Sequence, residues 1–265
     1  MSAPRDVLAT ILASVRAGVE IRRSREPVAA LERRAAARLP RGDAFVAALA
    51  APGPNVIAEC KRRSPSRGIL RADYDPATIA AAYRDGGAAA VSVLTEPAFF
   101  GGSLEHLAAV RTAIDLPLLR KDFIVSEYQV LEARAAGADA VLVIVAALDA
   151  ASLRRLLGCA RDCGLAAMVE VHDLTELAVA LDAGAAVIGV NARNLATLRV
   201  EPRVALELIP AIPAAITPVA ESGIRGAEDV RRLRAAGYRA FLVGERLMTA
   251  PAPGEALAVL LEGAA

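Results

Sequence analysis

The sequence predicts an α/β protein whose eight strand–helix units close into one barrel. Its 265 residues are close to the ~250 that are typical of such a barrel. A glycine ends a helix-like segment and precedes an apolar run four times, at Gly87, Gly137, Gly184 and Gly237, roughly 50 residues apart. One strand–helix unit needs ~30 residues or fewer, so each interval accommodates two units. The apolar runs do not alternate with polar residues, which is typical of parallel strands covered on both faces.

Each of these glycines predicts the boundary between a helix and the following strand, because glycine readily adopts the left-handed conformation that ends a helix. Four strands are expected within the glycine-containing segments 85–94, 136–145, 183–190 and 236–243. The four intervening strands are predicted at Asn55–Cys60, 117–121, 166–170 and 216–220. Strands that alternate with helices in this way favour a parallel sheet, and eight of them predict a (β/α)8, or TIM, barrel.

The segment before the first strand predicts a helical extension of the barrel. Residues 5–25 and 27–38 have the spacing of amphipathic helices, with Pro27 at a first helical position, and residues 43–50 form a short third helix. We expect residues 1–50 to pack on one end of the barrel, with residues 1–45 contributing to the mouth of the site. The whole chain, residues 1–265, is predicted to form a single domain.

Composition excludes several classes of protein. The formal net charge of +1 gives no electrostatic reason to expect a nucleic-acid or membrane partner. Three cysteines are too few for a disulfide framework, and no His/Cys cluster has the spacing of a metal site. No apolar run reaches the ~18 residues of a membrane span, and no signal peptide is recognisable. We therefore expect a cytoplasmic protein without metal or cofactor, with a monomer as the working expectation.

Polar residues end five of the predicted strands. Side chains alternate along a strand, so Glu59 and Lys61 share one face, as do Asn191 and Arg193. Lys121, Glu170 and Glu221 end three further strands. In barrels of this kind the active site lies at the carboxyl ends of the strands. Charges gathered there imply mutual pairing, a bound ligand, or both, because an unpaired buried charge is costly.

Two glycine turns predict a phosphate site. Ser222 and Gly223 follow the seventh predicted strand, and Gly244 follows the eighth. The loops after these two strands form the recurring phosphate site of such barrels. Glycine lets backbone N–H groups approach an anion closely. The substrate is therefore expected to be a phosphorylated small molecule.

Seven segments resemble the indole-3-glycerol phosphate synthases. They occur in the order found in that family and cover the chain from about residue 55 to its end: AECKRRSPSRG (58–68), SVLTEPAFFGGSL (92–104), LLRKDFIV (118–125), VEV (169–171), IGVNARNL (188–195), AESGI (220–224) and FLVGERLM (241–248). The pattern E-x-K-x-x-S-P-S together with L-x-K-D-F-I is highly specific. The helical extension before them is also similar to that of the family, although this match is loose.

This resemblance implies that the chain closes, decarboxylates and dehydrates 1-(2-carboxyphenylamino)-1-deoxyribulose 5-phosphate to indole-3-glycerol phosphate, a carboxy-lyase reaction of tryptophan biosynthesis. Lys121 matches the general acid that protonates the ketose oxygen, and Glu170 matches a second acid/base group that assists the loss of water. Lys61 and Glu59 match residues that hold and polarise the substrate, with Lys61 pairing with its carboxylate. Lysine suits the first step because ring closure needs a cation that can donate a proton to a carbonyl.

The remaining implied site residues fall into three groups. Asn191 and Arg193 match residues that orient the anthranilate part, and Glu221 is a further acidic residue. The positions that match phosphate ligands are Ser64, Ser222, Gly223, Gly244 and Glu245. The positions that match the lining of the aromatic pocket are Phe100, Phe123, Leu142 and Leu242.

Some residues depart from the family or support other functions. Many members carry a polar residue where Ala192 stands and a serine where Glu245 stands, so the side chain of Glu245 puts one phosphate contact in question. His172 is expected in a surface loop. A phosphoribosyl-anthranilate isomerase would share the phosphate site but needs a cysteine and an aspartate, and Cys60 has the parity opposite to Glu59. A barrel without activity that binds a phosphometabolite or a protein is the other alternative, which a turnover assay would separate.

Overall fold

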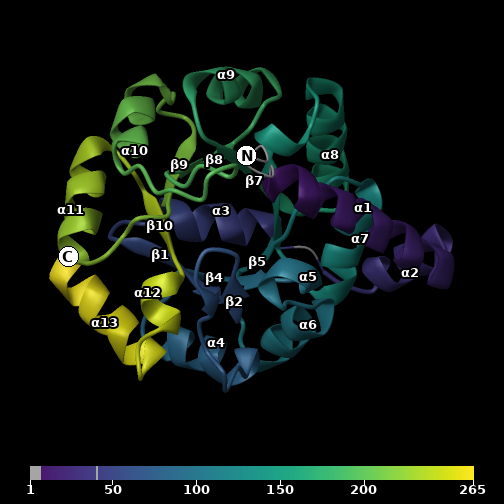
Figure 1. Ribbon diagram of the computed structural model, residues 1–265, viewed down its shortest axis with the longest axis horizontal. Helices are drawn as coiled ribbons and strands as arrows, with labels where there is room; N and C mark the ends of the chain where they lie inside the picture. Colours follow the sequence, from purple (N-terminus) through teal and green to yellow (C-terminus); the bar gives the residue numbers. More distant parts are fainter. Residues whose placement is uncertain (1–6, 40) are drawn as a thin grey trace, which may run out of the picture.

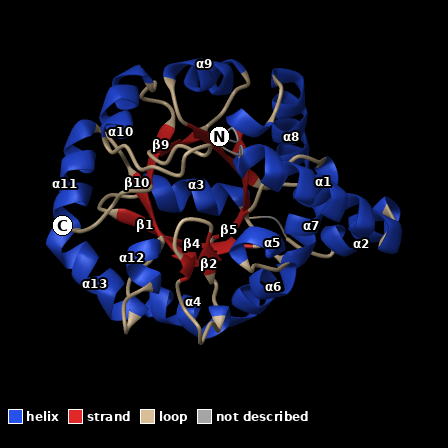
Figure 2. Cartoon of the chain, viewed as in Figure 1, coloured by secondary structure: helices blue, strands red, loops and turns tan. Residues whose placement is uncertain are grey.

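A computed structural model describes residues 7–39 and 41–265 of the chain. Eight parallel strands form a closed barrel in the order β1-β10-β9-β8-β7-β6-β5-β4. Figures 1 and 2 show the strands enclosed by a ring of helices. The barrel strands are β1 (Asn55–Cys60), β4 (Ala90–Leu94), β5 (Leu118–Lys121), β6 (Ala140–Ile144), β7 (Ala166–Val171), β8 (Val187–Asn191), β9 (Thr217–Glu221) and β10 (Ala240–Val243). The predicted (β/α)8 barrel is confirmed, and the strand ends differ from the prediction by about one residue.

Helices surround the barrel and return the chain to its amino-terminal end (Figure 2). They are α4 (Pro76–Asp85), α6 (Leu104–Ala113), α7 (Glu127–Ala136), α8 (Ala150–Asp162), α9 (Leu174–Asp182), α10 (Arg203–Leu208), α11 (Ala227–Ala236) and α13 (Pro253–Ala264). Gly137 ends α7 and Gly237 ends α11, with φ of 92° and 118°, as their predicted role requires. Among the described helices, none is both long and apolar enough to span a bilayer.

Short elements decorate the loops between strands and helices. After β1 the chain forms the hairpin β2 (Arg63–Ser64) and β3 (Gly68–Ile69), and α5 (Pro97–Phe100) follows β4. The helix α12 (Glu245–Met248) follows β10, and the 3-10 turns Val145–Ala147 and Ile209–Ala211 follow β6 and α10. The hairpin, α5 and α12 all lie on the carboxyl side of their strands, where a barrel places its site.

Two apolar cores lie on either side of the barrel wall. The outward-facing side chains of the strands, such as Val56 and Val143, pack under the surrounding helices. The inward-facing side chains, such as Ile57 and Leu142, form a second core. Glu59 follows Ile57 by two residues and therefore points inward, as predicted from parity. Cys60 belongs to the outer core, so it cannot serve as the acid or base of a site inside the barrel.

The inner core continues into the three helices that precede the first strand. They are α1 (Val7–Arg25), α2 (Val28–Ala36) and α3 (Gly42–Ala50). Pro27 precedes the first residue of α2 instead of occupying it. The predicted helix from residue 5 agrees with α1 from Val7 onward; residues 5 and 6 lie outside the described residues.

The three helices occupy different sides of the barrel. The helix α3 contacts β1, β4, β7 and β9, and its Phe45 and Leu49 are fully buried. Asn55, at the start of β1, donates to the Leu49 carbonyl, so α3 covers the amino-terminal end of the barrel. The helices α1 and α2 pack against α7 at the right of Figure 1.

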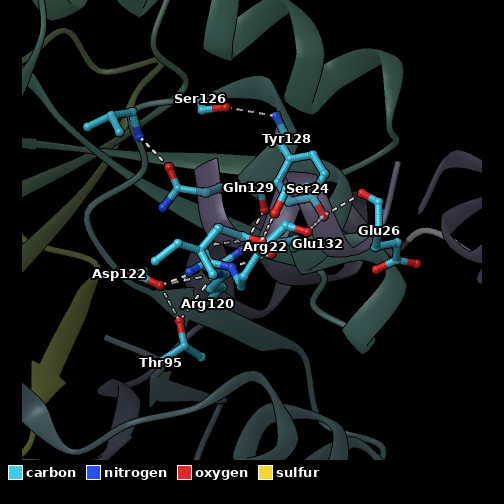
Figure 3. A network of polar contacts seen from close by, with 12 residues as sticks. Arg22, Ser24, Glu26, Thr95, Arg120, Asp122, Ser126, Tyr128, Gln129 and Glu132 are labelled. Atoms are coloured by element: carbon cyan, nitrogen blue, oxygen red, sulfur yellow. Dashed lines mark hydrogen bonds and ion pairs between the residues drawn. The ribbon is translucent and has the colours of Figure 1, made fainter. Parts of the chain in front are cut away.

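A buried ionic network joins α1 to the strand that carries Lys121. Arg120 points out of the barrel and is 1% exposed. Its Nη2 lies 2.9 Å from Asp122 Oδ2, and its Nη1 lies 3.3 Å from Glu132 Oε2 on α7. Arg22 of α1 completes the network by donating through Nε to Glu132 Oε1 at 2.5 Å (Figure 3). Each charge has an opposite partner, which is the condition for keeping such groups buried.

The same network fixes the loop that follows Lys121. Asp122 accepts from the Phe123 backbone N–H at 2.8 Å, and Thr95 donates to its other oxygen at 2.5 Å. Gln129 on α7 donates to the Phe123 carbonyl at 3.0 Å and accepts from the Val125 N–H at 2.9 Å. The backbone on the carboxyl side of Lys121 is therefore held by side chains that are not among the predicted site residues.

We predict that Arg120→Met lowers the free energy of unfolding by about 3–5 kcal/mol, because it leaves Asp122 and Glu132 buried without their cation. Urea denaturation measures this value. The matched control is Arg84→Met, whose pair with Asp85 is exposed and should contribute less than about 1 kcal/mol. Equal losses in the two variants would contradict the importance of the buried network.

Candidate functional site

A cavity of about 810 Å³ opens at the carboxyl ends of the strands. Nearly all the residues predicted for the site line it: Glu59, Lys61, Phe100, Lys121, Phe123, Leu142, Glu170, Asn191, Arg193, Glu221, Ser222, Gly223, Leu242, Gly244 and Glu245. Ser64 is the exception. It lines a smaller adjoining cavity of about 80 Å³, which shares Lys61, Phe100 and Arg193 with the large one and is bounded by Val7 and Leu8 of α1. The first turn of α1 thus reaches the mouth, whereas α3 lies at the opposite end.

Four charged side chains form one layer at the centre of the cavity. Glu59, Lys121, Glu170 and Glu221 come from β1, β5, β7 and β9, which are alternate strands around the barrel. Alternate strands contribute side chains to the same layer because of the strand stagger in such barrels. Lys121 Nζ lies 3.0 Å from Glu170 Oε2 and 2.9 Å from Glu221 Oε2. One ammonium group therefore holds two carboxylates together.

The burial of this layer changes the proton affinity of its members. Burial alone would lower the pKa of Lys121, but Glu170, Glu221 and Glu59 outweigh it and raise that pKa. Burial would raise the pKa of Glu170, but the charge of Lys121, with His172 and Asn191, lowers it well below its ordinary value. Burial raises the pKa of Glu221 to about 7, and the neighbouring Glu170 carboxylate adds to this rise. At neutral pH the layer therefore combines a charged lysine, an ionised glutamate and a glutamate close to its titration midpoint.

One oxygen of Glu221 has no polar partner within the described part of the chain. Its Oε1 is buried and makes no hydrogen bond among the described residues. It lies against Gly189 of the neighbouring strand, where an added Cβ atom would collide with it. A buried charged oxygen without a partner is costly, which favours the protonated form of this carboxyl group.

Lys61 and Asn191 connect the layer to the loops. Lys61 Nζ lies 2.5 Å from Glu59 Oε1, so the two residues of the first strand end form an ion pair. Asn191 Nδ2 donates to Glu170 Oε1 at 3.0 Å. Asn191 Oδ1 accepts from Ser222 Oγ at 2.8 Å and from the Arg193 backbone N–H at 2.9 Å. Asn191 thus ties the central layer to the loops after β8 and β9.

Two glycines provide the space that the layer needs. A Cβ atom on Gly189 of β8 would collide with Glu221 Oε1, and one on Gly244 would collide with Glu59 Oε1. Gly244 has a φ of −123°, which other residues also adopt. Residue 244 must therefore be glycine because the Glu59 carboxylate lies beside it. This reason applies in addition to the predicted role of Gly244 in anion binding.

The two turns predicted to bind phosphate lie at neighbouring strand ends. Ser222 and Gly223 after β9 both have left-handed φ values, 64° and 77°. Gly244 caps the amino terminus of α12. Glu245 does not project freely into this space: its Oε1 lies 2.8 Å from Arg67 Nη2, and its Oε2 lies 3.7 Å from Arg193 Nη2. The two guanidinium groups offset the negative charge that this side chain brings to the site.

An apolar wall lies beside the charged layer. The rings of Phe100 and Phe123 are tilted by 40° with centroids 6.1 Å apart. Leu142 and Leu242 project inward from β6 and β10 and are buried in the inner core. The cavity thus has an apolar side suited to a flat ring and a polar side suited to anions.

One residue near the site differs from its prediction. His172, expected in a surface loop, follows β7 directly and has a side chain only 14% exposed. Its Nε2 lies 3.3 Å from Glu170 Oε1, and its Nδ1 lies 2.9 Å from Glu176 Oε2 on α9. Its parity with Glu170, two residues earlier, was the signal that could have indicated an inward orientation. Ala192, which departs from the family, is buried and offers no polar group to the cavity.

Comparisons with known proteins agree on one family. The family model described as indole-3-glycerol phosphate synthase matches residues 8–260. The chain is 52% identical over 256 residues to the indole-3-glycerol phosphate synthase of Parafrankia sp. (strain EAN1pec), covering 97% of this chain and 95% of that protein. It is 53% identical over 248 residues to indole-3-glycerol phosphate synthase 2 of Streptomyces coelicolor, covering 94% and 96%. A solved structure of thiamine phosphate pyrophosphorylase from Pyrococcus furiosus has a TM-score of 0.61 at 18% identity, over 79% of this chain and 95% of that one, and shows the fold alone.

We predict that Gly189→Ala lowers the free energy of unfolding by about 1–3 kcal/mol, because the added methyl group forces Glu221 out of the layer. Thermal unfolding followed by circular dichroism measures the change. The control is Gly158→Ala on α8, where the added methyl group meets only one atom, 3.9 Å away. Its better helix propensity should raise stability by up to about 1 kcal/mol. Opposite signs are expected, and a neutral Gly189→Ala would contradict the close fit.

Proposed function

The chain belongs to the indole-3-glycerol phosphate synthase family, and from this premise we propose how its residues perform the reaction of that family. The substrate, 1-(2-carboxyphenylamino)-1-deoxyribulose 5-phosphate, loses CO₂ and water as the indole ring closes. A ring carbon attacks the ketose carbon, and the ketose oxygen must gain a proton. The carboxyl group then leaves as CO₂. Loss of the new hydroxyl group as water requires one proton donated to oxygen and one proton removed from the substrate.

Lys121 is the proton donor of ring closure in this proposal. Its ammonium group lies at the centre of the cavity with a raised pKa, so the proton is present at neutral pH. The two carboxylates that raise the pKa of Lys121 also oppose the release of its proton to the substrate. Glu221, with a pKa of about 7, relieves this opposition when it is protonated, because one negative charge beside Lys121 is then removed. The central layer is the observation that carries the proposal.

Glu170 takes part in the loss of water. Its lowered pKa means that it is ionised when the substrate binds, so it acts first as a proton acceptor. During dehydration this carboxylate accepts the proton that the substrate loses. Glu221 is a further acidic group of the site. Its protonated form returns a proton to Lys121, 2.9 Å away, and Lys121 then donates the proton that the leaving hydroxyl group gains. The two glutamates touch the same lysine but differ in charge, which suits groups with opposite proton-transfer tasks.

The remaining residues bind and orient the substrate. Lys61 gives up part of its contact with Glu59 and pairs with the carboxylate of the substrate. Glu59 positions groups of the substrate or transfers protons. Asn191 and Arg193 orient the anthranilate part. The aromatic ring occupies the apolar wall, and the residues proposed to line it are Phe100, Phe123, Leu142 and Leu242.

The phosphate group binds at the turns after β9 and β10. We propose that the backbone N–H groups of Gly223 and Gly244 approach it closely, with Ser222 and Ser64 adding hydroxyl groups. Glu245 contributes through its backbone, because its carboxylate is engaged by Arg67 and Arg193. No cofactor enters the proposal, because each step needs only proton donors, proton acceptors and anion-binding groups.

We also propose that the chain works as a single domain, as a monomer and in the cytoplasm. The inner core continues from the barrel into α1 and α3, which supports one folding unit. The exposed large hydrophobic residues are spread over separate elements, which supports a monomer. All three cysteines are free thiols, which fits a reducing compartment.

The direct test is to incubate the purified chain with the synthetic substrate and to follow the fluorescence of the indole product. Product formation without added metal or cofactor is expected. Turnover of a phosphoribosyl-anthranilate in place of this substrate would instead favour the isomerase alternative, and binding without turnover would favour a barrel without activity.

We predict that Lys121→Met lowers kcat by about 10²–10⁴, or roughly 3–5 kcal/mol of barrier, because the variant keeps the length of the side chain but lacks the proton. Lys121→Arg should not restore activity, since guanidinium holds its proton too tightly. Lys61→Met should raise KM more than it lowers kcat, because its task is pairing with a carboxylate. Steady-state kinetics of the three variants separate these effects, and near-normal kcat in Lys121→Met would refute the assigned step.

We predict that inorganic phosphate competes with the substrate and raises Tm. A ligand at about 100 times its Kd stabilises the fold by about 2.7 kcal/mol. Gly223→Val should abolish the Tm increase, because residue 223 has a φ of 77° and a side chain there would meet Val200. Gly158→Val serves as the control, since it lies on α8 away from the cavity. A Gly223→Val protein that phosphate still stabilises would count against the assigned turns.

A further inference from the structure

His172 is a buried titratable group that the reaction described above does not use. It lies at the end of β7, two residues after Glu170, and faces Glu170 from the side away from Lys121. Its Nε2 is buried and makes no hydrogen bond within the described residues, yet the Glu170 carboxylate lies 3.3 Å away. Among the described residues, Glu170 is the group with which Nε2 of this imidazole can pair.

The other ring nitrogen of His172 is held by α9. Nδ1 lies 2.9 Å from Glu176 Oε2, and the same oxygen accepts the His172 backbone N–H at 2.8 Å. Glu176 is itself fixed in the first turn of α9, where its N–H donates to Asp173 Oδ1 at 2.8 Å. The three side chains therefore form a line from the helix to the cavity, with carboxylate, imidazole and carboxylate in order.

We propose that His172 is a positioning residue which, together with Glu176, holds the Glu170 carboxylate in place and ionised for the reaction. The inference rests on the role proposed for Glu170. Glu170 Oε1 then receives Asn191 and His172, while its Oε2 receives Lys121. A carboxylate held at both oxygens cannot rotate freely, and preorganised groups of this kind contribute to catalysis without touching the substrate.

Electrostatics supports the charged form of this imidazole. Burial would lower the pKa of His172, but Glu170 and Glu176 outweigh it and raise the pKa to about 10. The ionisable groups that face the Glu170–His172 pair from the surrounding elements are Glu59 of β1, Lys121 of β5, Glu176 and Asp173 beside α9, and Glu221 of β9. Lys121 is the one other cation in this set, and it is shared with Glu221. His172 therefore supplies a second positive charge that, after Lys121, favours the ionised form of Glu170.

Kinetics as a function of pH tests this role. His172→Asn removes the cation beside Glu170, so the acidic limb of the kcat profile should move up by about 1–3 pH units, as expected for the loss of an opposite charge at this distance. At a pH between the acidic limbs of the two enzymes, the kcat of His172→Asn should be lower than that of the wild type by tenfold or more, with KM little changed. His172→Gln places a neutral donor near the position of Nε2, so it should recover kcat near neutral pH and retain the shifted limb. His106→Asn is the matched control, because the other histidine of the chain packs on Tyr74, away from the cavity lining.

Glu176→Gln tests the outer end of the line. It keeps the size of the side chain but removes the charge that holds the proton of His172. The alkaline limb of the kcat profile, where His172 loses its proton, should therefore move down from about 10.

NMR titration of the imidazole nitrogens in the wild-type chain gives a readout that needs neither a variant nor turnover. A His172 that stays protonated above pH 8 is expected. A pKa near the ordinary histidine value of about 6.5 would overturn the inference, as would a His172→Asn enzyme with the wild-type acidic limb. Equal loss of kcat at every pH in both His172 variants would indicate a structural role only and would also overturn it. A wild-type chain that makes no indole product would refute the proposed function instead, which keeps the two failures distinct.

Discussion

The burial of one lysine charge is the constraint around which the site is organised. Lys121 lies inside the barrel, where an ammonium group is stable only with anionic partners. Glu170 and Glu221 supply them at 3.0 and 2.9 Å. The barrel geometry brings alternate strands into one layer, so these partners can come only from particular strand ends. The neighbouring strands must then leave room, which explains the glycines at 189 and 244.

The strand β5 carries two adjacent cations to opposite sides of the barrel wall. Lys121 faces the cavity, and Arg120 faces α7, where Asp122 and Glu132 neutralise it. The outer network holds the backbone that follows Lys121 and reaches α1 through Arg22 (Figure 3). The position of the central lysine therefore depends on charges outside the central layer, and a helix that precedes the barrel is coupled to the site through them.

Strand-end position and parity predicted the barrel and the polar residues of the central layer, whereas the apolar lining of the cavity was predicted from the family resemblance. Parity along a strand was enough to place Glu59 and Lys61 on the inner side and Cys60 on the outer side. It was not enough for Arg120, whose partner Glu132 lies on α7 and becomes a neighbour only through the fold. His172 was missed for a related reason: its surroundings depend on how α9 starts, and a polar residue after a strand is usually solvated. The space requirement at Gly189 likewise appears only when Glu221 is placed opposite it.

The charge of Glu221 links the central layer to the proposed reaction. Glu170 and Glu221 share the ammonium group of Lys121. With a pKa of about 7, Glu221 is partly protonated at neutral pH, and its protonated form leaves Lys121 and Glu170 as an opposed pair. In the proposed function a substrate carboxylate binds beside Lys61, and this added negative charge would favour the protonated form of Glu221 further. Substrate binding and proton donation by Lys121 would then be linked through a single carboxyl group.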